Sequence, residues 1–386
     1  MLLLFILPFD VRNDSYAYEW VVFRAIHKIA DLGLLMPANY WRDVDARREL
    51  PIWAASPQVM KVYSYQIPST SDLESNPKFP LTHSSLDEVR RKLIGPGLIW
   101  AHTITERIPT LEAEIRDAID SAGQVDAVFL WTNCASMKAI AREKAIPLVH
   151  HELGPLRPPF FRFTAYFDFE GVNGQTDAKK RWERFQGEKA DVPVLPRDEL
   201  LKLVSLDREE AVAVVTHEVG IALQIPDDSN TLAFGNGFDS FETISTSLRY
   251  LSGSTLVRSH PGRNQTFSGL SVDWDDSARP GQFLNRINSL VTINSSMAFE
   301  AMLLGKPTYV LGESPFKCAS WDIATRSPAL LEEEMERWLN WFVFGYLIPF
   351  ELTFDVDYMW WRMGNPSERD IYLDNFKRWT QQQPSQ

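Results

Sequence analysis

The amino-acid sequence predicts an α/β protein of two domains, each with a parallel sheet and crossover helices. A chain of 386 residues exceeds what one hydrophobic core usually supports, which favours two domains. Hydrophobic residues make up 45% of the chain, the normal share for a folded soluble protein. Short apolar runs alternate with helix-like periodic segments in both halves, which is typical of parallel strands joined by helices.

The first half begins with a buried strand in the opening run MLLLFILPF. The next run, EWVVFRAIHKIADLGLL, predicts one amphipathic helix over residues 19–35. Residues 42–95 carry scattered Pro and Ser, so we expect loops and short elements there. Residues 110–122 predict a helix, and a strand, a helix and a strand follow in DAVFLWTN, ASMKAIAREKA and IPLVHHE.

A polar stretch with several prolines over residues 171–205 predicts the domain boundary. We therefore expect an N-terminal domain over residues 1–195, a second domain over residues 196–335 and a helical segment over residues 336–386. Strands of the second domain are expected in VGIALQIP, STLVRSHP, SLVTIN and PTYVLG. The apolar run at residues 338–350 is shorter than a membrane span and predicts a core or interdomain helix; contact with a membrane or a lipid-linked acceptor is the alternative.

The composition restricts the classes of partner. A net charge of −12 argues against a general binder of nucleic acid or of anionic membranes. The two cysteines, Cys134 and Cys318, are far apart and show no metal-ligand spacing, which suits reduced thiols in the cytoplasm. The opening apolar run lacks a basic region and meets Asp10 and Arg12 too soon for a signal peptide. We therefore expect a cytoplasmic protein without a nucleic-acid partner.

Residues 289–312, SLVTINSSMAFEAMLLGKPTYVLG, predict a strand, a sharp turn, a helix and a strand. Ser295 and Ser296 offer side chains that cap a helix start, and Gly305 is a good stop. A helix that starts directly after a parallel strand presents free N–H groups to a phosphate. Glu300 follows about one turn later, where it could reach a ribose hydroxyl beside that phosphate.

A second segment, TLVRSHPGRN, begins at Thr255 and predicts a strand that ends in Arg258, Ser259, His260 and Pro261. Pro261 stops this strand, so His260 is left at the carboxyl end of a sheet, where open α/β folds bind ligands. His260 is therefore a candidate to donate a hydrogen bond to a donor phosphate. A turn histidine bonded to the backbone is the alternative.

The two segments resemble the nucleotide site of sugar transferases that use CMP-activated donors, above all the bacterial retaining β-Kdo transferases of capsule and O-antigen (lipopolysaccharide) biosynthesis. ALQIPDDSN, residues 222–230, is similar to their Gln-x-x-x-Asp-Ser motif. HHELGPLRPPFF, residues 150–161, is similar to their Glu-(x)-Gly-x-x-Arg segment. The four matches follow the family order and span residues 150–316. The resemblance implies a GT-B-like fold, in which two Rossmann-like domains face a cleft and C-terminal helices cross back to the first domain.

The resemblance also implies the reaction: transfer of Kdo from CMP-β-Kdo to a glycan acceptor with retention, through a covalent aspartate adduct and without a metal or other cofactor. By the motif, Asp228 is the nucleophile; a turn with Asx chemistry is its alternative. Glu152 is the candidate general base or acid on the acceptor hydroxyl. Arg157 is expected to pair with Glu152 or to hold the Kdo carboxylate, with a surface ion pair as the alternative.

The expected donor contacts are Arg157, Arg258, Ser295, Ser296 and Glu300. Arg162 and Arg263 add positive charge in the same segments, and Asp10, Asn13 and Asp14 are candidates for an acceptor site. Two alternatives remain open: a transferase of this architecture with a sialic-acid or hexose donor, and a non-catalytic subunit of polysaccharide assembly. We expect the protein in the cytoplasm or peripherally at the inner membrane.

Overall fold

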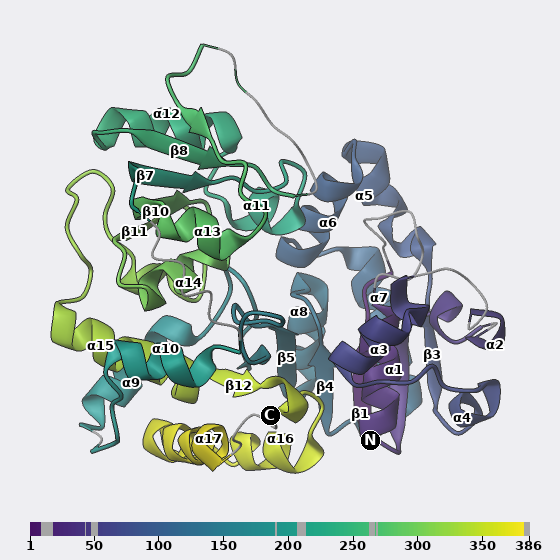
Figure 1. The fold of residues 1–386 in the computed structure, drawn as a ribbon. Coiled ribbons are helices and arrows are strands. Elements are labelled where there is room, and N and C mark those ends of the chain that lie inside the picture. Colours follow the sequence, from purple (N-terminus) through teal and green to yellow (C-terminus); the bar gives the residue numbers. More distant parts are fainter. Residues whose placement is uncertain are drawn as a thin grey trace. The chain divides into compact units, whose positions relative to one another are not determined.

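The α/β class is confirmed by the computed structural model, which describes residues 1–8, 18–42, 44–47, 53–189, 191–206, 214–261, 267 and 269–381 (Figure 1). Two sheets dominated by parallel strands form the framework, and helices connect successive strands. Asp10, Asn13, Asp14 and Arg263 lie outside the described residues, so their predicted roles stay predictions.

The larger sheet has seven strands in the order β12-β6-β5-β4-β1-β2-β3. Its strands are β1 (Leu2–Phe5), β2 (Leu32–Pro37), β3 (Lys78–Leu81), β4 (Ala127–Leu130), β5 (Leu148–Leu153), β6 (Thr164–Asp168) and β12 (Leu347–Pro349). The strands from β3 through β5 pair in parallel, and β12 pairs with β6 antiparallel. The carboxyl ends of β1, β2, β3, β4 and β5 therefore lie at one edge.

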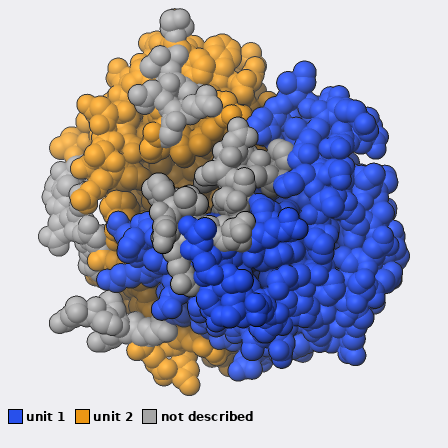
Figure 2. Space-filling view, turned by 90° about the vertical axis from the view of Figure 1, so that its right-hand side faces the viewer, with its two compact units in different colours: residues 1–152, 167–172, 351–365 blue, residues 153–166, 173–350, 366–386 orange. Residues whose placement is uncertain are grey.

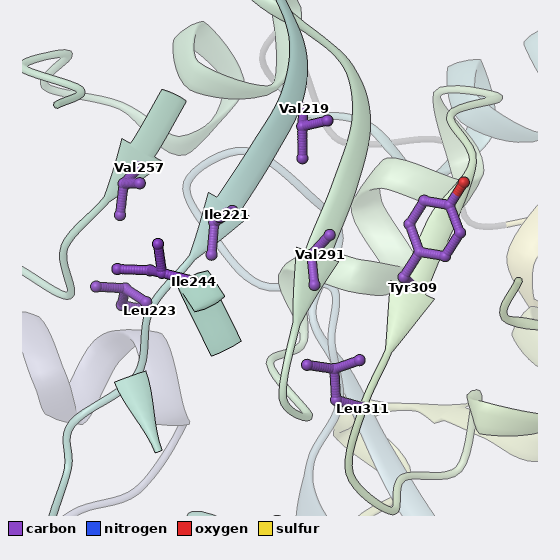
Figure 3. Close-up of a cluster of buried hydrophobic side chains, with 8 residues drawn as sticks. All are labelled: Val219, Ile221, Leu223, Ile244, Val257, Val291, Tyr309 and Leu311. Atoms are coloured by element: carbon purple, nitrogen blue, oxygen red, sulfur yellow. The ribbon is translucent and has the colours of Figure 1, made fainter. Parts of the chain in front are cut away.

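The smaller sheet has five strands, all parallel, in the order β11-β10-β7-β8-β9. Its strands are β7 (His217–Ala222), β8 (Thr255–Arg258), β9 (Asp273–Trp274), β10 (Ile287–Thr292) and β11 (Thr308–Val310). Its core includes buried side chains from β7, β8, β10 and β11 and Ile244 of the helix over Ser240–Tyr250 (Figure 3). The four strands predicted in this half are confirmed.

The helices occupy the connections between the strands. In the first part of the chain they are α1 (Glu19–Lys28), α2 (Val44–Arg47), α3 (Pro57–Tyr63), α4 (Thr70–Glu74), α5 (Asp87–Lys92), α6 (Pro96–Thr105), α7 (Pro109–Ala122) and α8 (Ala135–Lys144). In the remainder they are α9 (Ala178–Gly187), α10 (Arg197–Val204), α11 (Ser229–Phe234), α12 (Ser240–Tyr250), α13 (Pro280–Asn285), α14 (Met297–Leu303), α15 (Glu332–Trp341), α16 (Val356–Met363) and α17 (Glu368–Gln381).

The prediction of a single helix over residues 19–35 is wrong in its second half. Helix α1 ends at Lys28, and β2 begins at Leu32. All six residues of β2 are buried, and a Cβ on its Gly33 would come within 2.4 Å of the Leu3 side chain on β1. A strand buried on both faces is apolar throughout, so its sequence continues the apolar pattern of the helix before it.

The apolar segment at residues 338–350 lies in the core. It forms the end of α15, a π-helical turn over Phe342–Tyr346 and then β12, and its side chains are buried. The alternative in which this segment meets a membrane is therefore excluded by its burial. No described helix combines the length and the apolar character that a membrane crossing requires.

Contacts within the chain divide it into two compact units (Figure 2). Unit 1 consists of residues 1–152, 167–172 and 351–365, and unit 2 consists of residues 153–166, 173–350 and 366–386. The predicted domain ranges, residues 1–195, 196–335 and 336–386, stay predictions. The polar stretch predicted as the boundary contains α9 and α10, and Arg181 of α9 pairs with Glu368 of α17 at 2.9 Å, both inside unit 2.

Candidate functional site

The carboxyl edge of the smaller sheet contains a topological switch point. The chain leaves β7 through α11 and α12 to β8 on one side, and leaves β10 through α14 to β11 on the other. Because β7 and β10 are neighbours, the loops that follow them diverge at the carboxyl ends of these two strands. Ligands of open α/β sheets bind at such a point, which makes these two loops the first candidates for a binding site.

Two amide side chains join the loops at this switch point. Gln224 follows β7, and its Nε2 donates to Oδ1 of Asn294, which follows β10, at 2.7 Å. The backbone N–H of Asn294 donates back to Oε1 of Gln224 at 2.9 Å. Asn294 Nδ2 also donates to the carbonyl of Asn230 at 3.3 Å, and Asn173 Nδ2 donates to Oδ1 of Asn230 at 2.9 Å. The network fixes the loop after β7 against the loop after β10.

Asp228 sits on the loop that this network holds. Its Oδ1 accepts hydrogen bonds from the backbone N–H groups of Asn230 at 2.9 Å and Thr231 at 3.3 Å, so it is the N-cap of α11. Asp228 N–H itself donates to the Ile225 carbonyl at 3.0 Å. These bonds orient the carboxylate at the strand end. They also realise the alternative role in helix capping, which is compatible with a chemical role for the second carboxylate oxygen.

The segment at residues 289–312 folds as predicted. Helix α14 begins at Met297 after Ser295 and Ser296, and the side chain of Ser296 makes no capping bond. Ser295 Oγ accepts from the Met297 N–H at 3.3 Å. At the other end, Gly305 has φ of +73° and its N–H donates to the Met302 carbonyl at 3.0 Å, which is the expected glycine stop.

The charge of Arg157 interacts electrostatically with the carboxyl group of Glu300. Burial raises the pKa of Glu300 to about 7, and the positive charge of Arg157 opposes this rise. Near neutral pH the Glu300 carboxyl therefore exists in both protonation states, and it can either donate or accept a hydrogen bond. The prediction that Arg157 pairs with Glu152 or holds the Kdo carboxylate stays a prediction; the positive charge of Arg157 acts on Glu300 within unit 2.

The Gly-x-x-Arg part of residues 150–161 forms a closely packed turn. Gly154 packs so closely on Thr164 of β6 that a Cβ at Gly154 would lie 2.2 Å from Oγ1 of Thr164. Thr164 Oγ1 donates to the Leu156 carbonyl at 2.9 Å, which ties the loop to β6. Arg157 Nε donates to the Gly154 carbonyl at 2.7 Å and closes the turn. The loop thus presents the exposed Arg157 head group from a fixed base.

Arg258, predicted to contact the donor, has other partners. The residue is 7% exposed, and its Nη1 donates to Oδ2 of Asp275 and, at 2.9 Å, to the Ser277 carbonyl. Asp275 is fully buried and also accepts from Arg286 Nη1 at 3.0 Å. The guanidinium of Arg258 is therefore engaged in an ion pair inside unit 2, which favours a structural role for Arg258 over a contact with the donor. His260 is half-buried, and since β8 ends at Arg258 it lies two residues beyond the strand, which is shorter than predicted.

The larger sheet carries a different set of side chains near its carboxyl edge. Glu152 is half-buried near the end of β5 and belongs to unit 1, so it is not among the residues that the smaller sheet brings together. Its neighbour His151 is buried among rings of Phe129, Trp131 and Phe354, at centroid distances of 5.6, 6.4 and 5.1 Å. Burial lowers the pKa of His151 to about 3, so the ring is neutral.

Asp228 lies on the loop after β7, and Ser295 and Ser296 lie on the loop after β10, which the Gln224–Asn294 hydrogen bonds join within unit 2. Glu300 lies on α14, the helix that follows the second loop. We call the set Gln224, Asp228, Asn294, Ser296 and Glu300 the switch-point site. The sequence prediction missed the roles of Gln224 and Asn294, although Gln224 stands in the quoted motif. Within the described ranges, no three His, Cys, Asp or Glu side chains are grouped as a metal would need.

Comparison with known proteins gives one family match. Residues 4–177 match the model described as the glycosyltransferase 99 family N-terminal domain. This match confirms, for that part of the chain, the predicted resemblance to glycosyltransferases. It includes residues 4–120, where no motif was identified. The search of curated proteins finds no match.

Two solved structures are similar at low identity. One is KpsC of Thermosulfurimonas dismutans, described as a beta Kdo 2,7 transferase, with 14% identity, a TM-score of 0.42, and coverage of 61% of this chain and 82% of that chain. The other is KpsC of the same organism, described as a beta Kdo 2,4 transferase, with 18% identity, a TM-score of 0.40, and coverage of 56% and 79%. Both TM-scores lie under 0.5, so neither likeness bears on fold or activity.

Proposed function

We propose that the chain is a glycosyltransferase that moves Kdo from CMP-β-Kdo to a glycan acceptor with retention of configuration. The observation that carries the proposal is the Gln224–Asn294 pair, which holds the Asp228 turn against the loop that leads to Ser296 and Glu300. The family match over residues 4–177 supports the transferase class. The donor, the stereochemistry and the covalent adduct are parts of the proposal.

The donor would bind at the switch-point site. Ser296 Oγ, which makes no capping bond, and the half-buried His260 are the proposed phosphate contacts. Glu300 would bind a ribose hydroxyl, a neutral partner that suits a carboxyl of raised pKa in either protonation state. The exposed Arg157 head group, whose charge acts on Glu300, would pair with the carboxylate of Kdo, because a guanidinium binds carboxylates in bidentate fashion.

Transfer would proceed in two displacements. Asp228 attacks the anomeric carbon of Kdo, the bond from that carbon to the phosphate oxygen breaks, and CMP leaves with the electron pair. The acceptor hydroxyl then attacks the same carbon, the bond to Asp228 breaks, and a general base takes the hydroxyl proton; Glu152 is the candidate base that the family resemblance implies. Two inversions give net retention. In this proposal the bonds from Asn230 N–H and Thr231 N–H to Oδ1 leave Oδ2 of Asp228 as the attacking atom.

Metal independence and a cytoplasmic location, peripheral at the inner membrane, belong to the same proposal. The leaving phosphate would be stabilised by the Ser296 turn and His260 in place of a cation. The acceptor would be a glycan of the capsule or O-antigen type.

Nucleotide binding tests the donor assignment. CMP, UDP and GDP are each titrated into the protein with EDTA and again with Mg²⁺, and the unfolding temperature is recorded. CMP with EDTA should stabilise the fold, by about 2.7 kcal/mol at 100 times its Kd. The Glu300→Ala variant should lose this gain, and the Asp227→Asn variant should keep it.

Other outcomes decide between the remaining functions. Stabilisation by UDP or GDP but not by CMP would assign another sugar donor. A strict need for Mg²⁺ would contradict the metal-free site. Binding of no nucleotide at all would favour a non-catalytic subunit.

A further inference from the structure

The connection between α5 and α6 exposes apolar side chains at a loop tip in unit 1. Ile94 is 92% exposed, more than any other large hydrophobic residue of the described chain, and Leu98 is 46% exposed. Gly95, with φ of +103°, turns the chain between them, and Pro96 begins α6. A single exposed apolar residue needs no explanation, but two on one short turn form a small exposed apolar surface.

Basic residues stand directly behind this tip. The last turn of α5 is Arg90-Arg91-Lys92, and all its side chains reach solvent. The acidic residues of α5 are in its first turn, where Glu88 pairs with Lys92 at 2.7 Å and Asp87 approaches Arg90 at 3.5 Å. Three basic and two acidic residues leave a surplus of one positive charge on α5, concentrated at the end nearest the tip, in a chain of net charge −12.

A polar contact and apolar packing hold this loop tip in place on unit 1. His83, in the 3-10 helix before α5, contacts the carbonyl of Pro8 through Nδ1 at 2.9 Å, and Pro8 lies just past the end of β1. Below the tip, Val89 of α5 and Ile99 and Trp100 of α6 are buried. The tip therefore projects from a packed base that is tied to the carboxyl edge of the larger sheet, the edge at which α/β sheets bind ligands.

We infer that Ile94 and Leu98, with Arg91 and Lys92 behind them, form a contact site for an anionic phospholipid surface. Apolar side chains that enter the acyl boundary while basic ones meet lipid phosphates are the two parts of an interfacial anchor. A protein partner is less well matched, because specific protein interfaces bury about 800 Å² on each side and a two-residue convex tip offers little area. This surface is independent of the proposed reaction.

Vesicle binding tests the inference with the full chain. The protein is sedimented with vesicles of phosphatidylcholine alone and of phosphatidylcholine mixed with phosphatidylglycerol, at low and at high salt. Binding should need the anionic lipid and weaken at high salt. Ile94→Ser with Leu98→Ser should weaken binding at least tenfold. Arg91→Glu should weaken it at least fivefold, since one basic residue near an anionic surface contributes about 1 kcal/mol.

Matched controls change exposed residues elsewhere. Leu331 is 71% exposed and Lys202 is exposed on α10, so Leu331→Ser and Lys202→Glu should bind vesicles like the parent chain. Unfolding temperatures of all variants verify that the fold is retained. Absence of binding to anionic vesicles, or binding that the tip variants leave unchanged, would overturn the inference. Sugar transfer to a soluble acceptor is assayed separately without lipid, so failure of the proposed function leaves the vesicle result interpretable.

Discussion

The regions at the carboxyl edges of the two sheets differ in chemistry: the smaller sheet has hydrogen-bonded polar side chains there, and the larger sheet has aromatic side chains. At the smaller sheet, Gln224 and Asn294 exchange hydrogen bonds and a buried carboxyl, Glu300, lies near a positive charge. At the larger sheet, His151 is surrounded by aromatic rings, and neither of its ring nitrogens has a hydrogen-bond partner among the described residues. Both regions occupy the same place in their sheets, so the position alone does not decide the chemistry.

The polar region is preorganised by its hydrogen bonds, whereas the aromatic region contributes to core packing. A hydrogen-bonded loop pair holds polar groups where charge develops in a reaction, at no further cost of reorganisation. A histidine with a pKa lowered to about 3 is uncharged at neutral pH and contributes to the core as an aromatic ring. We therefore place donor chemistry in the first region and assign His151 no proton transfer.

The largest expected effect comes from Asp228. Asp228→Asn should lower transfer by about 10⁴-fold or more, because a nucleophile cannot be replaced by binding contacts. Asparagine caps helices as well as aspartate does, so the cap on α11 and the stability should persist. Steady-state transfer and unfolding temperature measure the two effects. Asp227→Asn is the control, and a variant at Asp228 with near-parental turnover would reduce this residue to a helix cap.

A smaller loss is expected from Gln224. Gln224→Glu removes the donor to Asn294 and sets two acceptor oxygens against each other, which should shift the Asp228 turn. We expect kcat to fall about 10²-fold with a smaller change in KM, as for a misplacement of about 1 Å. Asn173→Gly is the matched control, because it deletes an outer member of the network at a backbone φ of +60° that glycine tolerates. Equal losses in both variants would deny the Gln224–Asn294 pair its positioning role.

Glu300 should make stability depend on pH. Its folded pKa of about 7 exceeds its ordinary value of 4.5, so the folded state holds the proton more tightly than the unfolded state. Stability associated with the proton is thus fully present below the ordinary value and is lost as pH rises through about 7, by at most about 1.4 kcal/mol per unit of pKa difference. Glu300→Gln should abolish this decline, as urea unfolding at about pH 5 and about pH 8 would reveal. Parallel curves for both proteins would show that Glu300 is not desolvated.

The smallest effect is expected in the aromatic region. His151 has a lowered pKa, so its contribution to stability is present above its ordinary value of 6.5 and is lost as pH falls toward about 3. His151→Phe keeps an aromatic ring and removes the titrating group, so the unfolding free energy near pH 7 should change by about 1 kcal/mol or less. The acid-induced decline should become shallower. The exposed His27→Gln is the control, and an unchanged decline in His151→Phe would argue that His151 is already charged.

Local signals explain what the sequence could predict. The strand, turn, helix and stop at residues 289–312 were predictable because each is coded within a few residues, as at Gly305. The strand ends that carry Asp228 and His260 followed from the same reasoning. The role of Arg258 did not follow from local signals, because its partner Asp275 lies on another loop. The positive charge of Arg258 alone suggested an anionic ligand.

Contacts between distant segments explain the rest. Strand β12 pairs with Thr164–Tyr166 of β6 across more than a third of the chain, and no local pattern specifies that register. The bond between Gln224 and Asn294 likewise joins residues 70 positions apart. The buried strand β2 was taken into a helix because strands covered on both faces lose the alternation that marks a half-buried strand.

The central claim is that Asp228 becomes covalently linked to the transferred sugar. The protein is incubated with CMP-β-Kdo and no acceptor, and intact-protein mass spectrometry is followed by peptide mapping. The account predicts a mass increase of one Kdo residue on the peptide that holds Asp228, and none in Asp228→Asn. An adduct on Glu152, or retained configuration in the product without any adduct, would contradict it.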